Sequence, residues 1–475
     1  MTITRRSALG LAAGAGVFAL GGCGPASDRG RKHADVIVAG AGLSGLHAAR
    51  MLEEAGLDVL VIEANERPGG RLRTLRDLPG SPEAGGEQVG ATYARVRARA
   101  AEHGLAFEDF PQGRFGELVS VNGALITAQD WPSHAVNGLP ENWRQIPPHR
   151  LLFSVAGPRN PFPDVYAWMD EAAAAHDVAA ADWLRAQGAN DEALRLIDAT
   201  LNGSDVESYS MLNLFRTLAI YQQERGLGGS QGFADGAQSL PERMAAALKR
   251  EPRYGAEAIT FESDDHGARV LLMTGENLRA DYVICTVPFA ALRHLNVEAP
   301  LSEDQRAAID LLAYTPIVQL HLEAERAWWE EDGLAPEMWT DSPIERVFAR
   351  RDSNGDPTGM LTCWIDGRGA LMADDMDDAA LEAMARAELA RVRPASEGAA
   401  RLRHVQRWTA SNPYAGGAYM HWRPGEARRW AATMARPAGR LHFAGEHTGE
   451  LHTGMEAAME SGERAAIEIL DRAQA

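Results

Sequence analysis

The chain has 475 residues, 45% hydrophobic and 24% charged, which is long enough for two or three domains with a sizeable core. Its formal net charge of -19 excludes general nucleic-acid binding and a polybasic membrane patch. Only Lys32 and Lys249 are lysines, and the three cysteines form no CxxC or Cys/His cluster, so we expect no metal site.

The first 23 residues have the features of an export signal. Arg5 and Arg6 precede an apolar Gly/Ala-rich run that ends at Cys23 and is too short to span a membrane comfortably. The arginine pair is typical of the twin-arginine route, and the end of the run resembles a bacterial lipobox. We expect a tether at 24–33 and a periplasmic protein or one held at the membrane through Cys23. An ordinary cleaved signal and an uncleaved anchor are the alternatives.

A strand–helix–strand unit follows this leader. VIVA at 36–39 and VLVI at 59–62 are short apolar runs of the kind found in buried parallel strands. Between them, Ala48, Ala49 and Leu52 recur at helical spacing. The unit predicts a dinucleotide-binding domain.

The turn inside this unit carries a GxGxxG pattern. Gly40 permits the tight turn, Gly42 lets the backbone approach a pyrophosphate, and Gly45 allows close packing of helix on strand. The helix N-terminus then offers N–H donors to the phosphates. Glu63, eighteen residues after Gly45, is placed to accept a hydrogen bond from a ribose hydroxyl, which favours FAD or NAD.

The segment after Glu63, ANERPGGR, is where the chain begins to resemble the flavin-containing amine oxidases. Gly69 and Gly70 let the backbone pass beneath a flavin, and Arg71 is placed to contact the pyrophosphate or the flavin edge. Further blocks with the same resemblance are EAGGEQVG, RADYVICTVP, the GGAY loop and FAGE with the helix after it. The resemblance implies FAD as the cofactor and contact of a backbone amide at Ala256 with the adenine.

The resemblance also implies the set of cofactor-binding positions. They are Gly40, Gly42, Leu43, Ser44, Gly45, Glu63, Ala64, Gly70, Arg71, Gly86, Glu87, Ala256, Gly445, Glu446 and Met455. The helix that begins near Met455 points its N-terminus at the flavin, where N–H donors stabilise negative charge on the reduced ring.

The implied fold is α/β, with a Rossmann-type FAD-binding domain interleaved with a substrate domain of mixed sheet and helices. The FAD-binding domain takes residues 34–95, 230–300 and 430–473. The substrate domain takes residues 96–229 and 301–429.

At the positions that lie in front of the flavin in this family, the chain has only some of the family's residue types. Tyr419 matches one wall of the family's aromatic cage, whereas Gly454 occupies the place of the second tyrosine. Trp408 is expected to pack near the flavin. Ala418 stands where some members have the cysteine that bonds FAD, so we expect noncovalent FAD.

The lysine that holds a water at the flavin N5 in many members is missing. Its position matches Val318, and Gln319 or His321 are the candidates to hold a water instead. Strand alternation lets only one of residues 318 and 319 face inward. The acceptor of the electrons is therefore oxygen or a protein similar to a c-type cytochrome.

These features predict FAD-dependent oxidation of an amine C–N bond by hydride transfer, giving an imine that hydrolyses to an aldehyde or ketone. We expect Tyr419, Trp408 and Gln319 to be the catalytic residues. One alternative is an L-amino-acid oxidase. In such enzymes an arginine is expected after the Gly pair, where this chain has Glu87 and Gln88, so an arginine from elsewhere, for example Arg114 or Arg216, would have to replace it. The other is a flavin-binding protein without catalysis.

Overall fold

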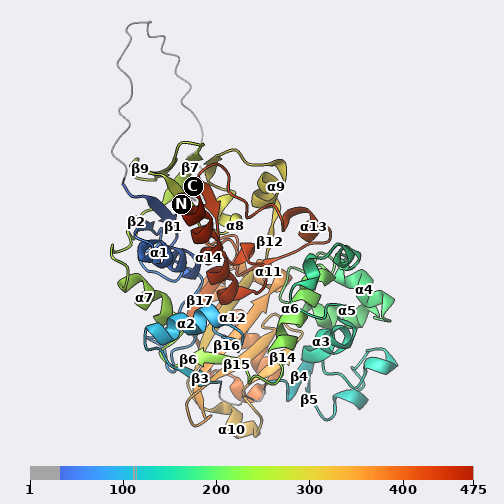
Figure 1. Ribbon diagram of the computed structural model, residues 1–475. Helices are drawn as coiled ribbons and strands as arrows, with labels where there is room; N and C mark the ends of the chain where they lie inside the picture. The colour runs from blue at the N-terminus through green and yellow to red at the C-terminus, as the bar shows by residue number, and fades with distance from the viewer. Residues whose placement is uncertain (1–32, 111–112, 114, 474–475) are drawn as a thin grey trace, which may run out of the picture. The chain divides into compact units, whose positions relative to one another are not determined.

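The computed structural model describes residues 33–110, 113 and 115–473 (Figure 1). The signal features at Arg5, Arg6 and Cys23, most of the predicted tether, and Arg114 lie outside these residues. The described residues form one compact unit. In the described ranges, no helix has the length and apolar character needed to cross a bilayer.

The nucleotide sheet is parallel and has the strand order β19-β10-β1-β2. Its members are β1 (Val36–Ala39), β2 (Val59–Ile62), β10 (Tyr282–Cys285) and β19 (Leu441–Phe443). All residues of these strands are buried, which suits the continuous apolar runs from which they are built. The predicted strands at 36–39 and 59–62 are confirmed with the same bounds. The C-terminal strand β19 thus completes a sheet that begins at residue 36.

Two helices from opposite ends of the chain pack together beside this sheet. Helix α1 (Leu43–Glu54) and helix α14 (Gly454–Ala473) lie side by side (Figure 1). A Cβ added at Gly462 would lie 2.2 Å from the carbonyl oxygen of Ser44, so only glycine permits this approach. The pairing holds the first turn of α1 and the first turn of α14 in a fixed relation.

The second large sheet has seven strands in the order β17-β13-β16-β15-β14-β4-β5 and is mixed, since β14 pairs parallel to β4. In its register, Gln319 on β13 (Ile317–Ala324) lies between Trp364 on β16 (Pro357–Asp366) and Gln406 on β17 (Ala400–Trp408). One face of β13 packs into an apolar cluster that includes residues of α12 (Asp378–Val392). The opposite face of β13 carries Gln319.

The remaining elements flank these two sheets. A smaller sheet has the order β11-β7-β8-β9, and the pairs β12-β18 and β3-β6 stand apart. The other strands are β3 (Phe107–Asp109), β4 (Leu118–Val121), β5 (Ala124–Thr127), β6 (Gln231–Phe233), β7 (Ala258–Ser263), β8 (Ala268–Leu272), β9 (Asn277–Ala280), β11 (Asn296–Glu298), β12 (Ala313–Tyr314), β14 (Met338–Thr340), β15 (Arg346–Arg351) and β18 (Met420–His421). The other α-helices are α2 (Ala94–Glu102), α3 (Leu151–Ala156), α4 (Ala180–Ala186), α5 (Asp191–Asp198), α6 (Met211–Gln223), α7 (Ser239–Ala246), α8 (Phe289–Leu292), α9 (Glu303–Leu311), α10 (Trp328–Asp332), α11 (Gly367–Asp374) and α13 (Glu426–Trp430).

The architecture is the expected α/β class, with a Rossmann-type sheet and a mixed sheet accompanied by helices. The strands of the nucleotide sheet fall within the segments predicted for the FAD-binding domain, and those of the seven-stranded sheet fall within the other segments. The exact domain limits stay a prediction, because the described residues form one compact unit.

Candidate active site

A cavity of about 370 Å³ is lined by residues from both the nucleotide sheet and the seven-stranded sheet. Most of the residues predicted from the sequence line it. These are Gly40, Gly42, Leu43, Ser44, Glu63, Ala64, Gly70, Arg71, Gly86, Ala256, Gln319, Trp408, Tyr419, Gly445, Glu446 and Met455. Segments more than 400 residues apart in the chain therefore meet around one space.

The glycine turn has the shape that a pyrophosphate requires. Gly40 has a φ of +115°, and a Cβ added there would lie 2.1 Å from Thr286 Oγ1. A Cβ at Gly45 would lie 2.0 Å from the carbonyl oxygen of Gly40. At Gly42, by contrast, a Cβ would meet nothing within 4 Å, although this residue lines the cavity. The three glycines thus have the tight turn, the close helix packing and the open space that their expected roles require, while their contact with the cofactor stays a prediction.

Glu63 presents a buried carboxylate beside this cradle. Its Oε2 accepts from the backbone N–H of Ala41 at 2.8 Å, and its Oε1 accepts from the backbone N–H and the Nδ2 of Asn65, each at 2.8 Å. A carboxylate has about four lone-pair positions, so acceptor capacity remains for a ribose hydroxyl. The fixed carboxylate and the open glycine turn both fit a dinucleotide.

The loop after β2 is held by two arginines. Arg67 donates to the carbonyl oxygens of Pro68, Leu72 and Gly70 at 2.9–3.0 Å, a role that is not among the sequence-based predictions. Arg71 Nη1 donates to the carbonyl oxygen of Ala418 at 2.9 Å and to Glu446 Oε1 at 2.8 Å. Arg71 therefore ties together three cavity segments that are far apart in the sequence. Its contact with the cofactor stays a prediction.

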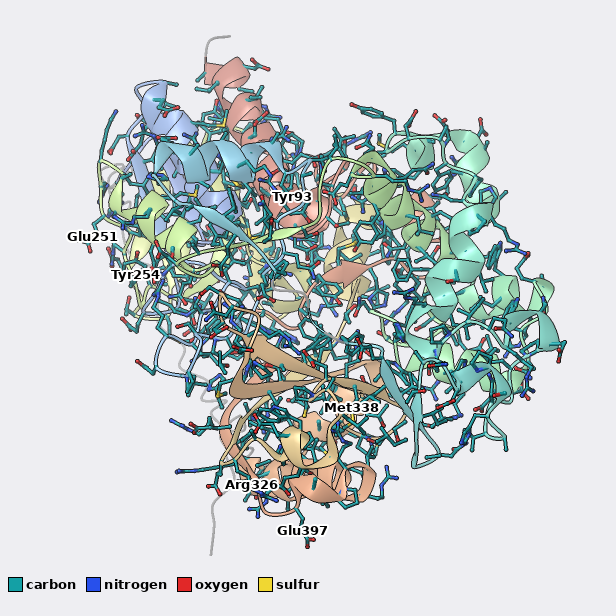
Figure 2. All side chains as sticks on the ribbon, turned by 90° about the horizontal axis from the view of Figure 1, so that it is seen from below. Tyr93, Glu251, Tyr254, Arg326, Met338 and Glu397 are labelled. Carbon is teal, nitrogen blue, oxygen red and sulfur yellow. The ribbon has the colours of Figure 1, made fainter. Side chains whose placement is uncertain are left out.

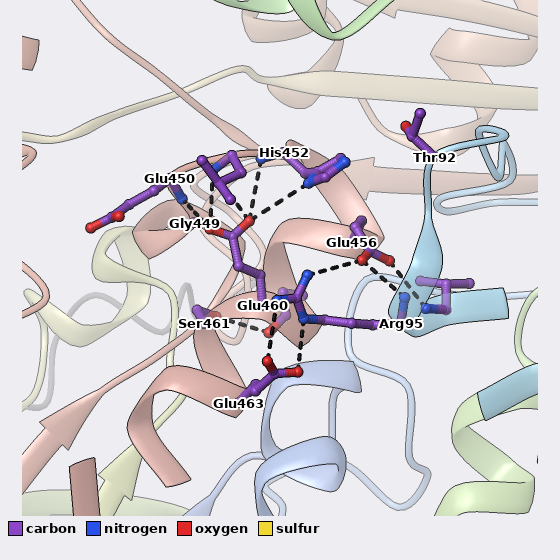
Figure 3. Close-up of polar contacts among 12 residues, drawn as sticks. Thr92, Arg95, Gly449, Glu450, His452, Glu456, Glu460, Ser461 and Glu463 are labelled. Atoms are coloured by element: carbon purple, nitrogen blue, oxygen red, sulfur yellow. Dashed lines mark hydrogen bonds and ion pairs between the residues drawn. The ribbon is translucent and has the colours of Figure 1, made fainter. Parts of the chain in front are cut away.

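Two carboxylates of helix α14 hold the segment that precedes this helix and the start of helix α2, as Figure 3 shows. Glu460 accepts from the backbone N–H groups of Glu450, Leu451 and His452 at 2.9–3.3 Å. Glu456, which is fully buried, accepts from the backbone N–H groups at the start of α2 at 3.0–3.1 Å. These contacts set the first turn of α14, where Gly454 and Met455 line the cavity.

Aromatic side chains wall the sheet end of the cavity. Tyr419, Trp408 and Trp364 line it together with Ile317. Burial raises the pKa of Tyr419 well above its usual value, so the phenol stays protonated. Trp408 Nε1 donates to the carbonyl oxygen of Ala84 at 2.6 Å, which fixes the plane of the indole. Trp364 was not predicted, because its place on this wall depends on the pairing of β16 with β13.

The backbone at Gly454, the position of the second tyrosine of the family's cage, does not favour a tyrosine. Gly454 has a φ of +61°, a conformation that side chains disfavour, and it lines the cavity. A Cβ added there would lie 3.7 Å from the hydroxyl of Tyr93, which Figure 2 labels beside α2. Tyr93 therefore approaches the space that the missing side chain would fill.

Side chains alternate between the two faces of β13, so only one of the neighbouring residues Val318 and Gln319 faces the cavity. Val318 is fully buried in the apolar cluster on the far face, whereas Gln319 lines the cavity. His321 Nε2 lies 3.2 Å from Gln319 Oε1, and Thr362 Oγ1 lies 3.1 Å from His321 Nδ1. Burial, followed by the nearby charges of His404 and Arg73, lowers the pKa of His321 to about 3, so its ring is neutral at pH 7. His321 holds Gln319 instead of lining the cavity itself.

Gly45 packs α1 against the turn, as expected, and does not itself line the cavity, so its contact with the cofactor stays a prediction. Two other expectations need correction. Glu87 does not line the cavity either, and its Oε1 instead accepts from Arg350 Nη1 at 3.1 Å. The backbone N–H of Ala256 donates to the carbonyl oxygen of Glu63 at 2.8 Å, so it is already used and the expected adenine contact through that amide is wrong.

Of the two arginines named for an amino-acid substrate, the structure describes only Arg216, which does not reach the cavity. Arg216 is buried, its Nη2 donates to the carbonyl oxygens of Gly449, Glu450 and His452, and it does not line the cavity. Arg114 lies outside the described residues. Arg73, two residues after Arg71, does line the cavity, and its Nη1 donates to Gln406 Oε1 at 3.1 Å. The second arginine of the GGRLR segment is the sequence feature that marks this position.

Comparison with known proteins agrees with this geometry. A family model described as "Flavin containing amine oxidoreductase" matches residues 43–470. The chain belongs to this family. An L-amino-acid oxidase of Siganus canaliculatus is 26% identical over 91% of this chain and 85% of its own length, and an L-amino acid oxidase of Lachesis muta is 25% identical over 91% and 86%.

Solved structures share the fold. Putrescine oxidase bound to putrescine superposes with a TM-score of 0.73 at 24% identity, covering 92% of this chain and 99% of that one. Cyclohexylamine oxidase from Brevibacterium oxydans gives a TM-score of 0.75 at 23% identity, covering 93% and 100%. As a member of the flavin containing amine oxidoreductase family, the protein is an FAD-dependent oxidoreductase that acts on amines, as the sequence predicted.

Proposed function

We propose that the substrate amine binds at the sheet end of the cavity, between Tyr419, Trp364 and Trp408, and is oxidised there to an imine that hydrolyses to an aldehyde or ketone. FAD, when bound, supplies the acceptor of the hydride equivalent. The observation that carries the proposal is the continuity of one cavity from the glycine cradle to the aromatic walls.

The chain's own residues prepare the amine for this reaction. Apolar walls disfavour an ammonium ion, so they favour the neutral amine whose lone pair assists oxidation. The rigid indole of Trp408 and the neutral phenol of Tyr419 exclude water and orient the C–N bond. Gln319, held by His321, is the polar group best placed to hold a water where other family members use lysine.

We propose further that FAD is held without a covalent bond. Ala418 lines the cavity, and a methyl group cannot form a thioether. Precipitation with acid should release all of the yellow flavin into the supernatant. Flavin that stays with the precipitated protein would contradict this proposal.

The route and acceptor are proposals that rest on the sequence. A protein that encloses noncovalent FAD is loaded before export, which suits the folded-state transport of the twin-arginine route suggested by Arg5 and Arg6. Cys23 would then hold the enzyme at the membrane, where oxygen or a protein similar to a c-type cytochrome accepts the electrons. Globomycin treatment and replacement of the arginine pair by lysines would test lipidation and export separately.

An anaerobic reduction screen tests the enzymatic proposal. Curated relatives are L-amino-acid oxidases and the structural neighbours are amine oxidases, so both substrate classes belong in the panel. We expect at least one amine to bleach the flavin absorbance, followed by recovery with oxygen or with cytochrome c. If no amine and no amino acid bleaches it, the protein is a flavin-binding protein without this catalysis.

A further inference from the structure

Residues 449–453, which we call the entry loop, lead the chain from the end of the nucleotide sheet into helix α14. The helix begins at Gly454, and both Gly454 and Met455 line the cavity. The N–H groups in the first turn of a helix have no partners inside the helix, so they are available to a ligand. The conformation of the entry loop therefore decides how the first turn of α14 lies against the cavity.

The carbonyl oxygens of the entry loop are held by Arg216, a buried side chain of helix α6. Its Nη2 donates to the carbonyl oxygens of Gly449, Glu450 and His452 at 2.7–3.2 Å. Among the described residues, no carboxylate lies within ion-pair distance of Arg216, and its Nε is buried without a hydrogen-bond partner. A buried charge is unfavourable unless it is paired, and carbonyl oxygens compensate it only in part. Such a charge points to a role beyond packing.

Trp168 holds the same loop and the same guanidinium. This buried residue belongs to the short 3-10 helix η5 (Ala167–Met169), and its Nε1 donates to the carbonyl oxygen of Glu450 at 3.0 Å. The guanidinium carbon of Arg216 lies 4.7 Å from the centroid of the Trp168 ring, which is a cation–π distance. The two side chains, which come from different helices, therefore fix each other against the entry loop.

The N–H groups of the entry loop are held by a different residue, Glu460 of helix α14 (Figure 3). Its carboxylate accepts from the backbone N–H groups of Glu450, Leu451 and His452 at 2.9–3.3 Å. Hydrogen bonds to a guanidinium and to a carboxylate are both charge-assisted, and they polarise the peptide groups that lie between them. The entry loop is thus held through its acceptors and through its donors.

We propose that Arg216 is a positioning residue for the flavin, which holds the entry loop so that the first turn of α14 keeps its place at the cavity and favours reduced FAD. The N–H donors and the dipole of a helix N-terminus stabilise negative charge, and reduced flavin carries more of it than oxidised flavin. Arg216 does not line the cavity, so it acts through the loop. The inference goes beyond the proposed amine oxidation, since it concerns the redox preference of the flavin whichever amine is the substrate.

Hydrogen exchange tests the hold on the loop in the FAD-loaded enzyme without any turnover. Arg216→Met fills a similar space without donors, so we expect the amides of residues 450–452 to exchange about 30-fold faster than in wild type. Arg185→Met is the matched control, because Arg185 lies on helix α4 and pairs with Glu207 at 2.7 Å. It should leave the exchange of the loop unchanged. Wild-type exchange in Arg216→Met would show that this side chain does not hold the loop.

The midpoint potential of the bound flavin, measured against a reference dye, tests the consequence. Arg216→Met should weaken the preference for reduced over oxidised FAD about tenfold, which lowers the potential of this two-electron couple by about 30 mV. Arg216→Lys returns the charge without the planar fork, so exchange and potential should both stay between those of wild type and Arg216→Met. A potential restored by lysine while the loop still exchanges fast would reveal a direct effect of the charge and overturn the positioning role. An unchanged potential in Arg216→Met would overturn it as well.

Trp168→Phe guards against a variant that merely fails to fold. It removes the Nε1 donor but keeps a ring against the guanidinium, so we expect about threefold faster exchange and an about threefold weaker preference for reduced FAD. If it lowers the thermal stability but changes neither quantity, these contacts are only structural and the inference fails. None of these measurements uses an amine. If no amine bleaches the flavin but the shifts occur, the proposed reaction fails and the role of Arg216 stands.

Discussion

The two ends of the cavity are built in different ways. At the nucleotide end, backbone conformation and the absence of side chains make the site, as at Gly40 and Gly42, and one carboxylate completes it. At the sheet end, side chains from β13, β16 and β17 make the site, and strand register decides which of them face inward. A site made of backbone is a local property of a short segment. A site made of cross-strand neighbours belongs to the assembled sheet.

The sharpest test of this contrast places a lysine at adjacent positions of β13. Val318→Lys puts a charge into the apolar cluster on the far face, where Val318 is 0% exposed. We expect this variant to lose more than about 4 kcal/mol of the free energy of unfolding or to be insoluble. Gln319→Lys faces the cavity and should remain folded with FAD. Thermal unfolding of the two purified proteins distinguishes them, and equal stabilities would contradict the register.

Alanine at two glycines of the turn tests the other end. Gly45→Ala forces a Cβ to within 2.0 Å of the Gly40 carbonyl, so we expect a loss of about 1–3 kcal/mol of unfolding free energy and poor retention of FAD. Gly42→Ala meets open space and should leave apoprotein stability within about 0.5 kcal/mol. Its FAD dissociation constant should still rise about tenfold, because the added methyl occupies the cradle. Denaturant unfolding and FAD titration measure the two quantities, and a stability loss at Gly42 matching that at Gly45 would refute the assignment.

Trp364 tests the apolar wall of the sheet end. Trp364→Leu keeps an apolar side chain but removes part of the wall, so kcat/KM for a bulky amine should fall about tenfold. FAD content should be unchanged, since the glycine turn and Glu63 are untouched. Steady-state kinetics with a bulky and a small amine measure the effect, and an equal loss for both would argue against a role in shaping the pocket.

The smallest expected effect is the pH dependence of stability contributed by His321. Burial, then the charges of His404 and Arg73, lower its pKa in the folded state to about 3, below the usual 6.5. The unfolded chain therefore binds a proton between these values that the folded chain does not, so stability falls with falling pH in this window. From pH 7 to pH 6 this amounts to about 0.7 kcal/mol. Denaturation curves of wild type and His321→Gln should differ in slope by this amount, and identical slopes would contradict the neutral ring.

The nucleotide end was predictable because its determinants lie close together in the sequence. The strand runs, the three glycines and Glu63 all fall within 28 residues and are found where expected. For the sheet end of the cavity, the sequence predicted which kinds of residue are present but not which of them face the cavity. Whether Val318 or Gln319 faces the cavity, and that Trp364 joins the wall, follow from pairings with strands about 45 residues further along the chain.

Arg73 and Ala256 show why the remaining positions escaped prediction. Arg73 acquires its role from Gln406, which is 333 residues away in the sequence. The amide of Ala256 is taken by the carbonyl of Glu63, a backbone contact that no side-chain pattern encodes. Such contacts depend on the final geometry of the chain, so residue identity and spacing do not fix them.

The completion of the nucleotide sheet by β19 has a consequence for the order of biosynthesis. Strand β19 and helix α14 are among the last described residues of the chain, yet they flank the glycine turn near its start. Contacts of such high sequence separation form late and slow the folding of the whole unit. The ribosome must therefore finish nearly the entire polypeptide before the cofactor pocket can close. Loading of the flavin is then a post-translational event, and a chain that ends before residue 441 lacks both the last strand and the helix that frame the pocket.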